Sequence, residues 1–542
     1  TAATRVNADG NIEKETSNLL LQSNSFDTTW SLVNTSVASG QSGYDGSSDA
    51  WLFTALATSN CQVRQTISGS GVQSISIYAK ANTSNFLGIN AIVGSTNAIA
   101  YFDLSSGAVG TINSAVIDAN IESVGGGWYR CSLVYSDTNT QMRFFLSDAD
   151  GSATVTNGNS IYIQDAQLNQ GLIAQEVITT TTTALYGGIT DNVPRLDYTD
   201  SSCPALLLEP QRTNAVSYSS YLGSWSASNA AQSFGVTSPE GVDNAYSYVT
   251  NSNISSLSTG VVIPNDNNTH ITSIFVKNVS GYSNIRLRSA LIYGTSVATY
   301  SNFDLSSGTK IYSVQDGGIE DYGNGWYRIW NAVTNNTSGN TTLAFQLYLT
   351  NDSNQTNEMS VFGGQAELNC SYPTSYIPTY GTSVTRNAEE ASKTGVSSLL
   401  NDSEGTLFLE VKGISDGGDS RRLSISDGTT NNRVIIEIDE IAGRFKSFMS
   451  SGGVTTGTLT SSGNVQTDTN KIAVTYTASI FKMYLNGVNV VNDTTLVGTP
   501  IGLEIIRFAS SSNAHKMQGL VKQTIYFPTA LSNEEAIALT TI

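Results

Sequence analysis

The amino-acid sequence predicts an all-β protein made of three consecutive β-sandwich domains, the first two of which are copies of one module. Three observations lead to this prediction. Apolar and polar residues alternate along many short segments, as they do in strands with one buried face. Charged residues make up only 13 % of the 542 residues, and 48 glycines stand against 9 prolines, which suits short strands and tight turns better than helices. Several phrases also occur twice, in the same order.

An internal duplication is the strongest feature of the sequence. The phrase GGGWYR at Gly125–Arg130 returns as GNGWYR at Gly323–Arg328. The other repeated pairs are FDLSSG (Phe102–Gly107 and Phe303–Gly308), SISIYAK with TSIFVK (Ser74–Lys80 and Thr272–Lys277), DAQLN with QAELN (Asp165–Asn169 and Gln365–Asn369), and the tryptophans Trp30 and Trp225. We therefore expect two sandwiches with the same strand order, with Trp128 over Trp326 and Phe102 over Phe303.

The repeats and the connecting segments divide the chain into residues 1–185, 186–385 and 386–542. The strands of the first module run to about Gly171, and a stretch rich in threonine and glycine, Val177–Gly188, follows as a polar linker or edge strand. Ala388–Leu400 connects the second module to the third. The third module contains no GWYR phrase. It ends in a short helix predicted at Ser532–Leu539, where Ser532 and Glu535 form a capping box.

The FDLSSG phrase indicates the end of a strand followed by a turn, with a glycine that can adopt positive φ. Its aspartates, Asp103 and Asp304, are explained by this turn, and metal ligation is the alternative. The GWYR phrase is likewise interpreted as a turn that leads into a strand, and so as a signature of the fold.

Composition excludes several classes of function. The net charge of −18 and the lack of a basic stripe argue against a nucleic-acid partner. No apolar run is long enough to span a membrane, so we expect no membrane insertion. The two histidines, His270 and His515, fall in different modules, which argues against structural zinc or a histidine-based triad within one module.

Two groups of phrases resemble known protein families. The first group resembles the repeated carbohydrate-binding-module-like jelly rolls of tailed-bacteriophage tail fibres and head fibres. It consists of PALLLEPQRTN (Pro204–Asn214), SYPTSYIPT (Ser371–Thr379), the lead-in ATRVNADGNIE (Ala3–Glu13), FDLSSG and GWYR. The second group, Lys471–Val488 and Ile525–Leu539, resembles the laminin-G and concanavalin-A-like lectin sandwich.

The resemblance implies a phage virion appendage on the virion surface that adheres to a host polysaccharide or glycan. It also implies a homo-oligomer, attached to other virion proteins through an anchor upstream of Thr1. No cofactor is required, and Ca²⁺ is the one ion that the lectin resemblance suggests. A structural spacer without a ligand and a bacterial surface adhesin are the alternatives.

Sugar sites need aromatic faces for pyranose rings and polar side chains for hydroxyl groups. Aromatic residues shared by both repeats, such as Trp128 and Trp326, are expected to be structural. Aromatic residues present in one repeat only are the better candidates for a binding site. These are Tyr44, Tyr282, Tyr293 and Trp330.

Four cysteines provide a further expectation. Cys61 and Cys131 lie on apolar faces of predicted strands in the first module, and neither has a cysteine counterpart in the second, where Ile329 aligns with Cys131. Joint absence is what a contacting pair would show, although two independent changes give the same pattern. We expect Cys61 and Cys131 on neighbouring strands, with Cα atoms within the roughly 4.4–6.8 Å that a disulfide allows. Cys203 and Cys370, near the start and the end of the second module, are a second candidate pair.

One phrase, IEIDEI at Ile436–Ile441, resembles a catalytic strand. Retaining glycosidases of a concanavalin-like fold carry Glu-x-Asp-x-Glu, whose two outer carboxylates act as nucleophile and acid. Glu437 and Asp439 match the first two places, but Ile441 stands at the third and Glu440 points to the other face. We interpret the phrase as an acidic, exposed strand face.

We therefore predict that the third module does not hydrolyse glycosides, because one of the two working carboxylates is missing. Incubation with host polysaccharide should release no reducing ends. Release that the Glu437→Gln variant abolishes would contradict the prediction.

Overall fold

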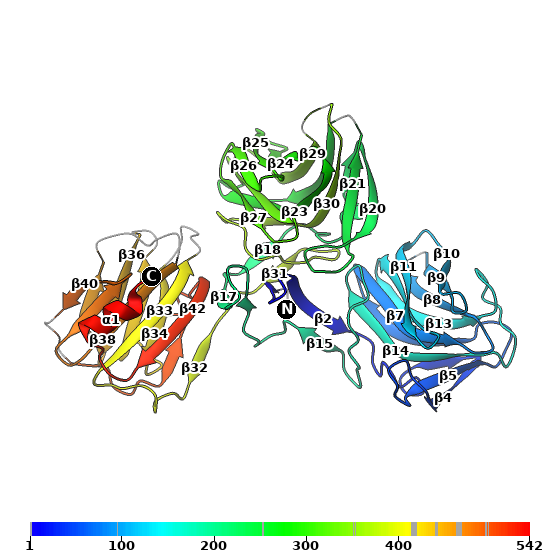
Figure 1. The fold of residues 1–542 in the computed structure, drawn as a ribbon, viewed down its shortest axis with the longest axis horizontal. Coiled ribbons are helices and arrows are strands. Elements are labelled where there is room, and N and C mark those ends of the chain that lie inside the picture. The colour runs from blue at the N-terminus through cyan, green and yellow to red at the C-terminus, as the bar shows by residue number, and fades with distance from the viewer. Residues whose placement is uncertain are drawn as a thin grey trace.

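The computed structural model describes residues 3–94, 96–251, 254–350, 352, 354–413, 420–439, 443–461, 469–493, 496 and 498–542. It contains three β-sandwiches around a small central sheet (Figure 1), which confirms the predicted all-β fold class. Sandwich 1 is blue and cyan in Figure 1, sandwich 2 is green, and sandwich 3 runs from yellow to red. The central sheet contains β1 (Thr4–Val6), β2 (Ile12–Asn18) and β15 (Leu185–Gly188).

Sandwich 1 consists of two six-stranded sheets, 1a and 1b. In sheet 1a the spatial order is β10 (Ala108–Ile112), β9 (Ala98–Asp103), β8 (Phe86–Val93), β13 (Asn139–Ser147), β6 (Gln62–Gly69) and β3 (Ser31–Val33). In sheet 1b it is β11 (Val116–Gly125), β12 (Trp128–Ser136), β7 (Val72–Ala81), β14 (Ser160–Gln170), β5 (Ala50–Ala55) and β4 (Thr35–Gln41).

Sandwich 2 consists of sheets 2a and 2b. In sheet 2a the order is β26 (Thr309–Ser313), β25 (Val297–Asp304), β24 (Asn284–Ile292), β29 (Thr342–Thr350), β22 (Ser255–Val262) and β19 (Ser226–Ser228). In sheet 2b it is β27 (Gly317–Asp321), β28 (Tyr327–Thr334), β23 (Thr269–Gly281), β30 (Asn357–Leu368), β21 (Ala245–Thr250) and β20 (Ala230–Val236), with β18 (Arg212–Asn214) and β31 (Val384–Arg386) paired beside β30.

The two sandwiches have the same strand order, so the predicted duplication is confirmed. Each strand of sheets 1a and 1b has a counterpart at the same place in sheets 2a and 2b. The registers agree as well, because Cys131 stands opposite Ile77 and its counterpart Ile329 stands opposite Ile274. In the other sheet, Phe102 stands opposite Leu87 as its counterpart Phe303 stands opposite Ile285.

One repeated phrase is aligned differently by the structure. On β14, Gln167 stands opposite Ser76, and on β30, Gln365 stands opposite Ser273, so these two glutamines are counterparts. The similar letters of DAQLN and QAELN had paired Gln365 with Asp165, which lies two residues before Gln167. Both strands contain a bulge close to this point, and the register of the neighbouring strand decides the alignment. The counterpart of Asp165 is therefore Gly363.

The turn interpretation of FDLSSG is confirmed in both copies. The Asp103 carboxylate accepts hydrogen bonds from the backbone N–H and the hydroxyl of Ser105, at 2.8 and 2.6 Å. Asp304 accepts the same two bonds from Ser306, at 2.9 and 2.7 Å. Each aspartate thus satisfies the donors of its own turn.

The GWYR phrase is a turn followed by a buried aromatic anchor. The three residues before Trp128 have φ of 91°, 60° and 80°, and those before Trp326 have 75°, 52° and 78°. Glycine adopts this left-handed region freely, and Asn324, the middle residue of the second turn, is among the residues that tolerate it best. Both tryptophans are 3 % exposed, so the structural interpretation is confirmed.

Sandwich 3 consists of sheets 3a and 3b. In sheet 3a the order is β16 (Leu196–Asp197), β17 (Ala205–Leu208), β42 (Gly519–Phe527), β33 (Gly405–Gly413), β38 (Thr469–Tyr476), β39 (Phe481–Leu485) and β40 (Val488–Asp493). In sheet 3b it is β32 (Ser392–Thr394), β41 (Ile505–Arg507), β34 (Arg421–Ser426), β35 (Arg433–Asp439), β36 (Arg444–Ser451) and β37 (Val454–Thr460). Two strands from the range 186–385, β16 and β17, therefore extend a sheet of the third sandwich.

The predicted C-terminal helix is present as α1 (Asn533–Thr540). Ser532 is its N-cap, and the reciprocal bonds between Ser532 and Glu535 complete the predicted capping box. The helix packs on sheet 3a through Ala536. In the part of the chain that the structure describes, no helix is both long and apolar enough to cross a membrane.

The expected disulfides are wrong in this structure. All four cysteines lie among the described residues, and all four are free. Cys61 precedes β6 in sheet 1a, whereas Cys131 lies on β12 in sheet 1b, so they are not on neighbouring strands. Both thiols are buried in the core of sandwich 1. Cys203 is exposed and Cys370 is buried among apolar residues of sandwich 2. The joint absence of cysteine in the second repeat reflects two separate core substitutions.

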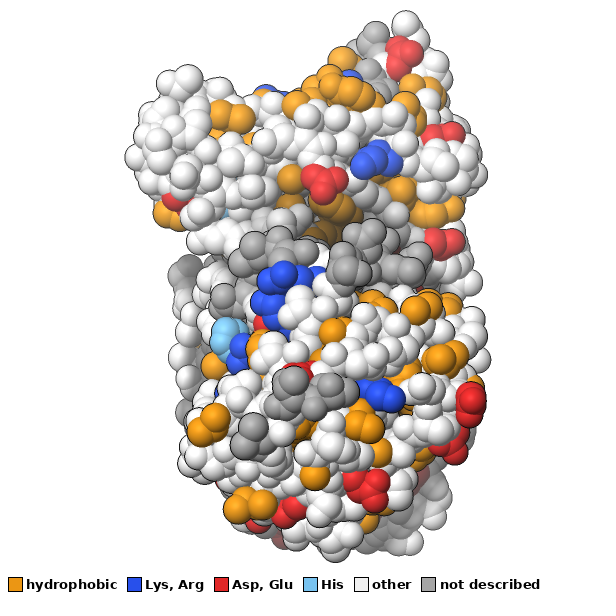
Figure 2. Space-filling view, turned by 90° about the vertical axis from the view of Figure 1, so that its left-hand side faces the viewer, with side chains coloured by type: hydrophobic (Ala, Val, Ile, Leu, Met, Phe, Trp, Pro, Cys, Tyr) orange, Lys and Arg blue, Asp and Glu red, His pale blue; other side chains and the backbone are white. Residues whose placement is uncertain are grey.

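The surface shows the same low charge as the composition. Figure 2 faces the side of the molecule that carries sandwich 3, and most of this surface is white, which marks uncharged polar side chains and backbone. Acidic and basic side chains are scattered over it, apart from one group of basic side chains near its centre. Uncharged polar side chains and backbone together thus account for most of the described surface in this view, in line with the low share of charged residues.

A buried ionic cluster around Glu209, which follows β17, lies where the central sheet, sandwich 2 and the connector to sandwich 3 meet. Glu209 is 3 % exposed, and its Oε2 lies 2.7 Å from Arg195 and 2.7 Å from Arg386. Arg195 also pairs with Glu389 at 2.6 Å and donates to the carbonyl of Thr4 at 2.6 Å. The cluster therefore ties together the N-terminal strand, the segment before sandwich 2 and the connector to sandwich 3.

The Glu209 carboxylate is stabilised as an anion in this place. Burial by itself raises the pKa of Glu209, but Arg386, Arg195 and hydrogen bonds from Ser375 lower it to about 2. The backbone N–H and the hydroxyl of Ser375 donate to this carboxylate at 2.8 and 2.6 Å. Because the pKa is lower in the folded state, this contribution to stability is present above the unfolded pKa of about 4.3 and is lost as the pH falls toward 2.

We predict that Glu209→Gln lowers the free energy of unfolding by about 3–5 kcal/mol at neutral pH, because it leaves Arg386 buried without a carboxylate partner. The measurement is urea denaturation followed by tryptophan fluorescence. The difference from wild type should shrink as the pH falls below about 4.

Glu13→Gln is the matched control. Glu13 pairs with Arg5 at 2.9 Å in the corresponding place before sandwich 1, but these side chains are 31 % and 21 % exposed. An exposed pair contributes about 0–1 kcal/mol, so this variant should stay close to wild type. Equal losses in the two variants would show that the buried cluster has no special role.

Candidate functional site

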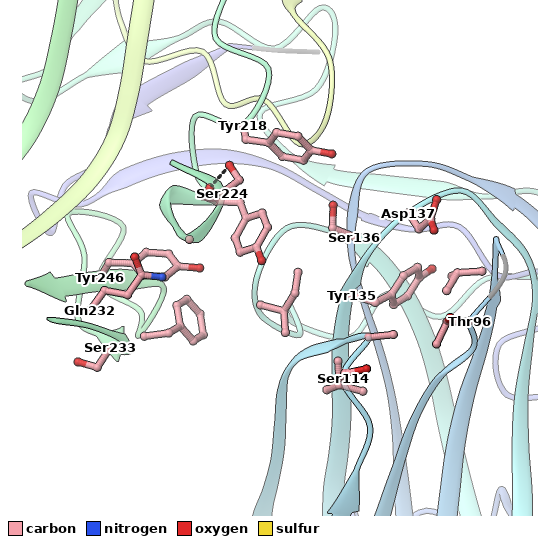
Figure 3. A pocket seen from close by; sticks show the side chains of 17 residues that line it. Thr96, Ser114, Tyr135, Ser136, Asp137, Tyr218, Ser224, Gln232, Ser233 and Tyr246 are labelled. Atoms are coloured by element: carbon pink, nitrogen blue, oxygen red, sulfur yellow. Dashed lines mark hydrogen bonds between the residues drawn. The ribbon is translucent and has the colours of Figure 1, made fainter. Parts of the chain in front are cut away.

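A cleft of about 710 Å³ lies between sandwich 1 and sandwich 2. Figure 3 shows Tyr218, Tyr246 and Gln232 of sandwich 2 on one side of the opening and Tyr135 and Asp137 of sandwich 1 on the other. Its lining combines the aromatic rings of Tyr135, Tyr218, Tyr221, Phe234 and Tyr246 with polar groups from both walls. We call it the inter-sandwich cleft.

Direct contacts hold the two walls of the cleft in place. Val72, Val134 and Leu172 of sandwich 1 pack into the apolar cluster that forms the core of sandwich 2. The N–H of Val72 donates to the carbonyl of Tyr380 at 2.6 Å. A Cβ on the preceding residue, Gly71, would lie 1.8 Å from that carbonyl oxygen, so only glycine permits this approach.

A buried ion pair adds a polar contact between the modules. Lys14 on β2 lies 2.6 Å from Glu240 in the turn between β20 and β21. Burial by itself lowers the pKa of Lys14, but Glu240 and neighbouring tyrosines raise it above its ordinary value. The N–H of Ile12 donates to the carbonyl of Pro239 at 2.8 Å beside this pair. These contacts between the modules fix the distance between the two walls of the cleft.

The sandwich 2 wall is a series of aromatic rings. The ring of Tyr221 lies 5.9 Å from that of Tyr218 and 6.5 Å from that of Tyr246, and Phe234 lies 5.1 Å from Tyr246. A single 3₁₀ turn, η1 (Leu222–Ser224), buries Leu222 in the core and leaves Tyr221 half-buried at the rim. Burial and the neighbouring Tyr218 raise the pKa of Tyr221, so its hydroxyl is neutral at physiological pH.

The sandwich 1 wall is mixed, with Val93, Ala115, Val116 and Ile117 beside polar side chains. Tyr135 is buried, donates to Gln73 Oε1 at 2.7 Å and accepts from the Nδ2 of Asn139 at 2.5 Å. These bonds hold its ring at the base of the wall. Asp137 is exposed beside it, and Ser114 adds a hydroxyl group. The cleft thus presents aromatic faces opposite hydroxyl and carboxylate groups.

Such an arrangement suits a polyhydroxylated ligand. The apolar faces of sugar rings pack on aromatic side chains, and their hydroxyl groups bond to amides, hydroxyls and carboxylates. Gln232 and Ser224, both exposed at the rim, extend the hydrogen-bonding capacity of the aromatic wall.

The structure places the four predicted binding residues outside this cleft and does not bring them together. Tyr44 lies in sandwich 1, between β4 and β5, where its ring stacks on Tyr78 at 3.7 Å. Its hydroxyl donates to Asp165 at 3.1 Å. Tyr44 therefore covers the outer face of sheet 1b.

The other three predicted residues are dispersed over sandwich 2. Tyr282 and Tyr293 flank opposite ends of β24, and Tyr293 is 79 % exposed with φ of 76°. Trp330 lies on the outer face of sheet 2b, against Ile271 and Cys370. Binding roles for these residues remain predictions.

The sequence interpretation missed the aromatic wall, although one signal was available. Tyr218 and Tyr221 occur in the second repeat only. The indoles of Trp30 and Trp225 donate to the carbonyls of Gln22 and Tyr218, so the structure pairs Tyr218 with Gln22 and Tyr221 with Ser25. The same criterion that selected Tyr44 applies to both of them. The position between two modules was not visible in the sequence.

The acidic strand of sandwich 3 is buried, so its interpretation as an exposed face was wrong. Glu437 is 2 % exposed and lies 2.6 Å from Arg422, and Asp439 is 8 % exposed and lies 2.5 Å from Lys446. Arg422 and Lys446 stand directly opposite Glu437 on the flanking strands, so each carboxylate has a cationic partner. Glu440 and Ile441, which completed the phrase, lie outside the described residues.

Calcium binding stays a prediction. The described residues contain no group of three or more histidine, cysteine, aspartate or glutamate side chains arranged to hold a metal ion. Asp103 and Asp304, the alternative metal ligands, are engaged in their turns.

Comparisons with known proteins identify similar β-sandwiches. No protein-family model matches the chain, and no curated protein matches it. Among solved structures, it is similar to the CBM40 of the Ruminococcus gnavus IT-sialidase bound to α2,3-sialyllactose, with 18 % identity, a TM-score of 0.23, and coverage of 26 % of this chain and 84 % of that chain. It is also similar to domains LG4-5 of the mouse laminin α1 chain, with 12 % identity, a TM-score of 0.18, and coverage of 56 % and 92 %. These low TM-scores support no functional argument, which must come from the geometry of the site.

Asp165 combines backbone strain with burial. Its φ is 47°, and its counterpart Gly363 has φ of 59°, so a carboxylate stands where the other repeat uses glycine. Burial raises the pKa of Asp165 to about 6, although the Tyr44 hydroxyl opposes this shift. Because the pKa of Asp165 is higher in the folded state, this residue adds to the free energy of unfolding at low pH, and this contribution is lost as the pH rises through about 6.

We predict that Asp165→Asn raises the free energy of unfolding by about 1–3 kcal/mol at neutral pH, because the amide carries no charge to desolvate. The midpoint of thermal unfolding, measured between pH 4 and pH 7, should depend less on pH than in wild type. Asp304→Asn is the control, since hydrogen bonds from Ser306 lower the pKa of Asp304 to about 2, and this variant should not gain stability. A loss of stability in Asp165→Asn at neutral pH would contradict the prediction.

Proposed function

We propose that the protein is a non-catalytic adhesion module that binds glycans in the inter-sandwich cleft. The observation that carries this proposal is the series Tyr218, Tyr221, Tyr246 and Phe234, which faces hydroxyl and carboxylate groups of a mixed wall across a cleft of about 710 Å³. A cleft of this size holds a short oligosaccharide, since ligand pockets typically measure about 300–1,000 Å³.

We further propose that the module belongs to a tailed-phage appendage on the virion surface and that the glycan lies on the host cell. The support is the resemblance of the LEPQRTN and GWYR phrases to virion jelly rolls. Residues of both phrases are buried, since Glu209 in the first phrase pairs with Arg195 and Arg386 and Trp128 in the second is 3 % exposed. The alternative is a bacterial surface adhesin built from the same modules. The genes that lie next to the gene for this protein would distinguish the two.

Several copies of the chain in one appendage would strengthen weak binding at each site. An open cleft with few charged groups suits weak binding of single sugars, and linked sites gain about 10²–10⁴ in overall affinity. Homo-oligomerisation therefore forms part of the proposal, and no metal ion is needed for it.

The test is a glycan array followed by calorimetry with the best ligand. We predict that Tyr221→Ala weakens binding at least about tenfold, which corresponds to a loss of about 1.4 kcal/mol. Tyr221 is half-buried at the rim, so its replacement removes a ring face from the cleft and leaves the core intact.

Tyr312→Ala is the matched control. Tyr312 is 51 % exposed on β26, far from the lining of the cleft in sequence and fold, and its loss should leave affinity unchanged. Wild-type protein that binds no glycan would favour the structural spacer. Binding that depends on Tyr293 instead of Tyr221 would move the site to the exposed turn between β24 and β25.

A further inference from the structure

A second cavity, of about 290 Å³, lies on the outer face of sheet 1b. We call it the side pocket. Its floor is formed by β11 and β12, and its walls are Leu172–Ala174 of sandwich 1 and Phe234 with Asp243 of sandwich 2. Phe234 lines both the side pocket and the inter-sandwich cleft, so the two cavities adjoin at this ring.

The floor of the side pocket is a regular array of polar side chains. On β11 and β12, Asn120 stands directly opposite Ser132, and Glu122 stands directly opposite Arg130. Residues directly opposite in an antiparallel pair point to the same face. Asp118, opposite Val134, extends the row toward the cleft.

Two polar groups of this floor have no partner within the described chain. Ser132 is 8 % exposed, lines the pocket, and its hydroxyl makes no hydrogen bond with any described residue. The Nε of Arg130 is buried and also without a hydrogen-bond partner among these residues. Ser132 therefore offers a free hydroxyl group to a polar ligand. The Nε of Arg130 is not by itself a sign of a ligand, because the Nε of its counterpart Arg328 has no partner among the described residues either.

The second repeat shows what the same place looks like when it is filled. The counterparts of Asn120 and Ser132 are Gly318 and Trp330, which also stand opposite each other. The indole of Trp330 lies over Gly318, where a Cβ would be 2.4 Å from its Nε1. Sandwich 2 therefore fills with a tryptophan the volume that sandwich 1 leaves open.

The charge of the side pocket selects the kind of ligand. Three carboxylates line it, Asp118, Glu122 and Asp243, against one cation, Arg130. Arg130 is already engaged with the carbonyl of Gln175 and the hydroxyl of Ser76. Excess negative charge in a partly buried pocket attracts a cation and repels an anion such as a sialic or uronic acid. Burial also raises the pKa of Asp118, as expected for a carboxylate that lacks a cationic partner.

We propose that the side pocket is a second subsite, which takes a sugar unit with a free, protonated amine, while neighbouring units of the same glycan occupy the inter-sandwich cleft. This inference rests on the proposed function for the cleft. The amine lies among Asp118, Glu122 and Asp243, and the sugar hydroxyls bond to Ser132, Asn120 and the Nε of Arg130.

The test transplants the filled arrangement of sandwich 2 into sandwich 1. The double variant Asn120→Gly/Ser132→Trp places an indole over a glycine, a combination that the fold accommodates at Gly318 and Trp330. The probes are a β-1,4-linked glucosamine pentamer with free amines and its fully N-acetylated form. Calorimetry is done with the full chain in a low-salt buffer in which the amines are protonated.

Wild type should bind the free-amine pentamer at least about tenfold more tightly than the acetylated form, and added salt should reduce this preference. The double variant should lose the preference. Asp118→Asn, which changes no volume, should reduce it as well and keeps the test valid if the double variant fails to fold. Tyr312→Ala should retain the preference.

The outcomes separate the inference from the proposed function. Equal affinity of wild type for both pentamers, binding of neither, or an unchanged preference in the two pocket variants would overturn the side-pocket inference. Loss of glycan binding in Tyr221→Ala together with any of these results would leave the function of the cleft standing. In a further outcome, the double variant abolishes the preference for the free-amine pentamer while Tyr221→Ala leaves it intact. This result would support the side pocket as a binding site and would contradict binding in the cleft.

Discussion

The buried carboxylate of Glu209 is the constraint that holds the central sheet, sandwich 2 and the connector to sandwich 3 together. Domains joined by short connectors normally move relative to one another. Here Arg195 and Arg386 both pair with this one carboxylate, and Arg195 also reaches Glu389 and the N-terminal strand. The ions are out of water, so losing one partner leaves an uncompensated buried charge, and this cost opposes separation of the segments. The walls of the cleft between sandwiches 1 and 2 are held by separate contacts, the Val72–Tyr380 hydrogen bond and the Lys14–Glu240 ion pair.

Sandwich 1 and sandwich 2 share one arrangement of strands, and a few residue differences between them give the two sandwiches different surfaces. Arg130 and Arg328 lie over aromatic rings of the neighbouring strand at the same distance, 5.5 Å, so the frame around them is shared. Two residues further along the same strand, serine in the first copy and tryptophan in the second decide whether a pocket is open or filled. Asp165 against Gly363 is a similar case, in which a strained backbone position carries a carboxylate in one copy only. Departures from the repeat are therefore the places where function is expected.

The binding residues could not be predicted from the sequence, because they lie between two modules. Alternation and repeats report contacts within one module, and they explain why Trp128 and Trp326 were correctly assigned to the fold. Tyr221 contributes to the site because η1 directs it toward a surface of another module. Nothing in the local sequence states which surface that is. Ser132 would never be selected from the sequence, because a lone serine on a strand carries no signal until its counterpart Trp330 is seen to fill the same volume.

The sequence by itself determined the all-β class, the duplicated strand order, the FDLSSG and GWYR turns and the capping box of α1. These features depend on short-range periodicity and on residues that satisfy their own backbone, as Asp103 does. Only the tertiary structure decided that the four cysteines are free, that β16 and β17 extend sandwich 3, and that Asp165 corresponds to Gly363. Each of these depends on register or on packing between distant segments, where the free energy comes from burial and ion pairing that no local pattern encodes.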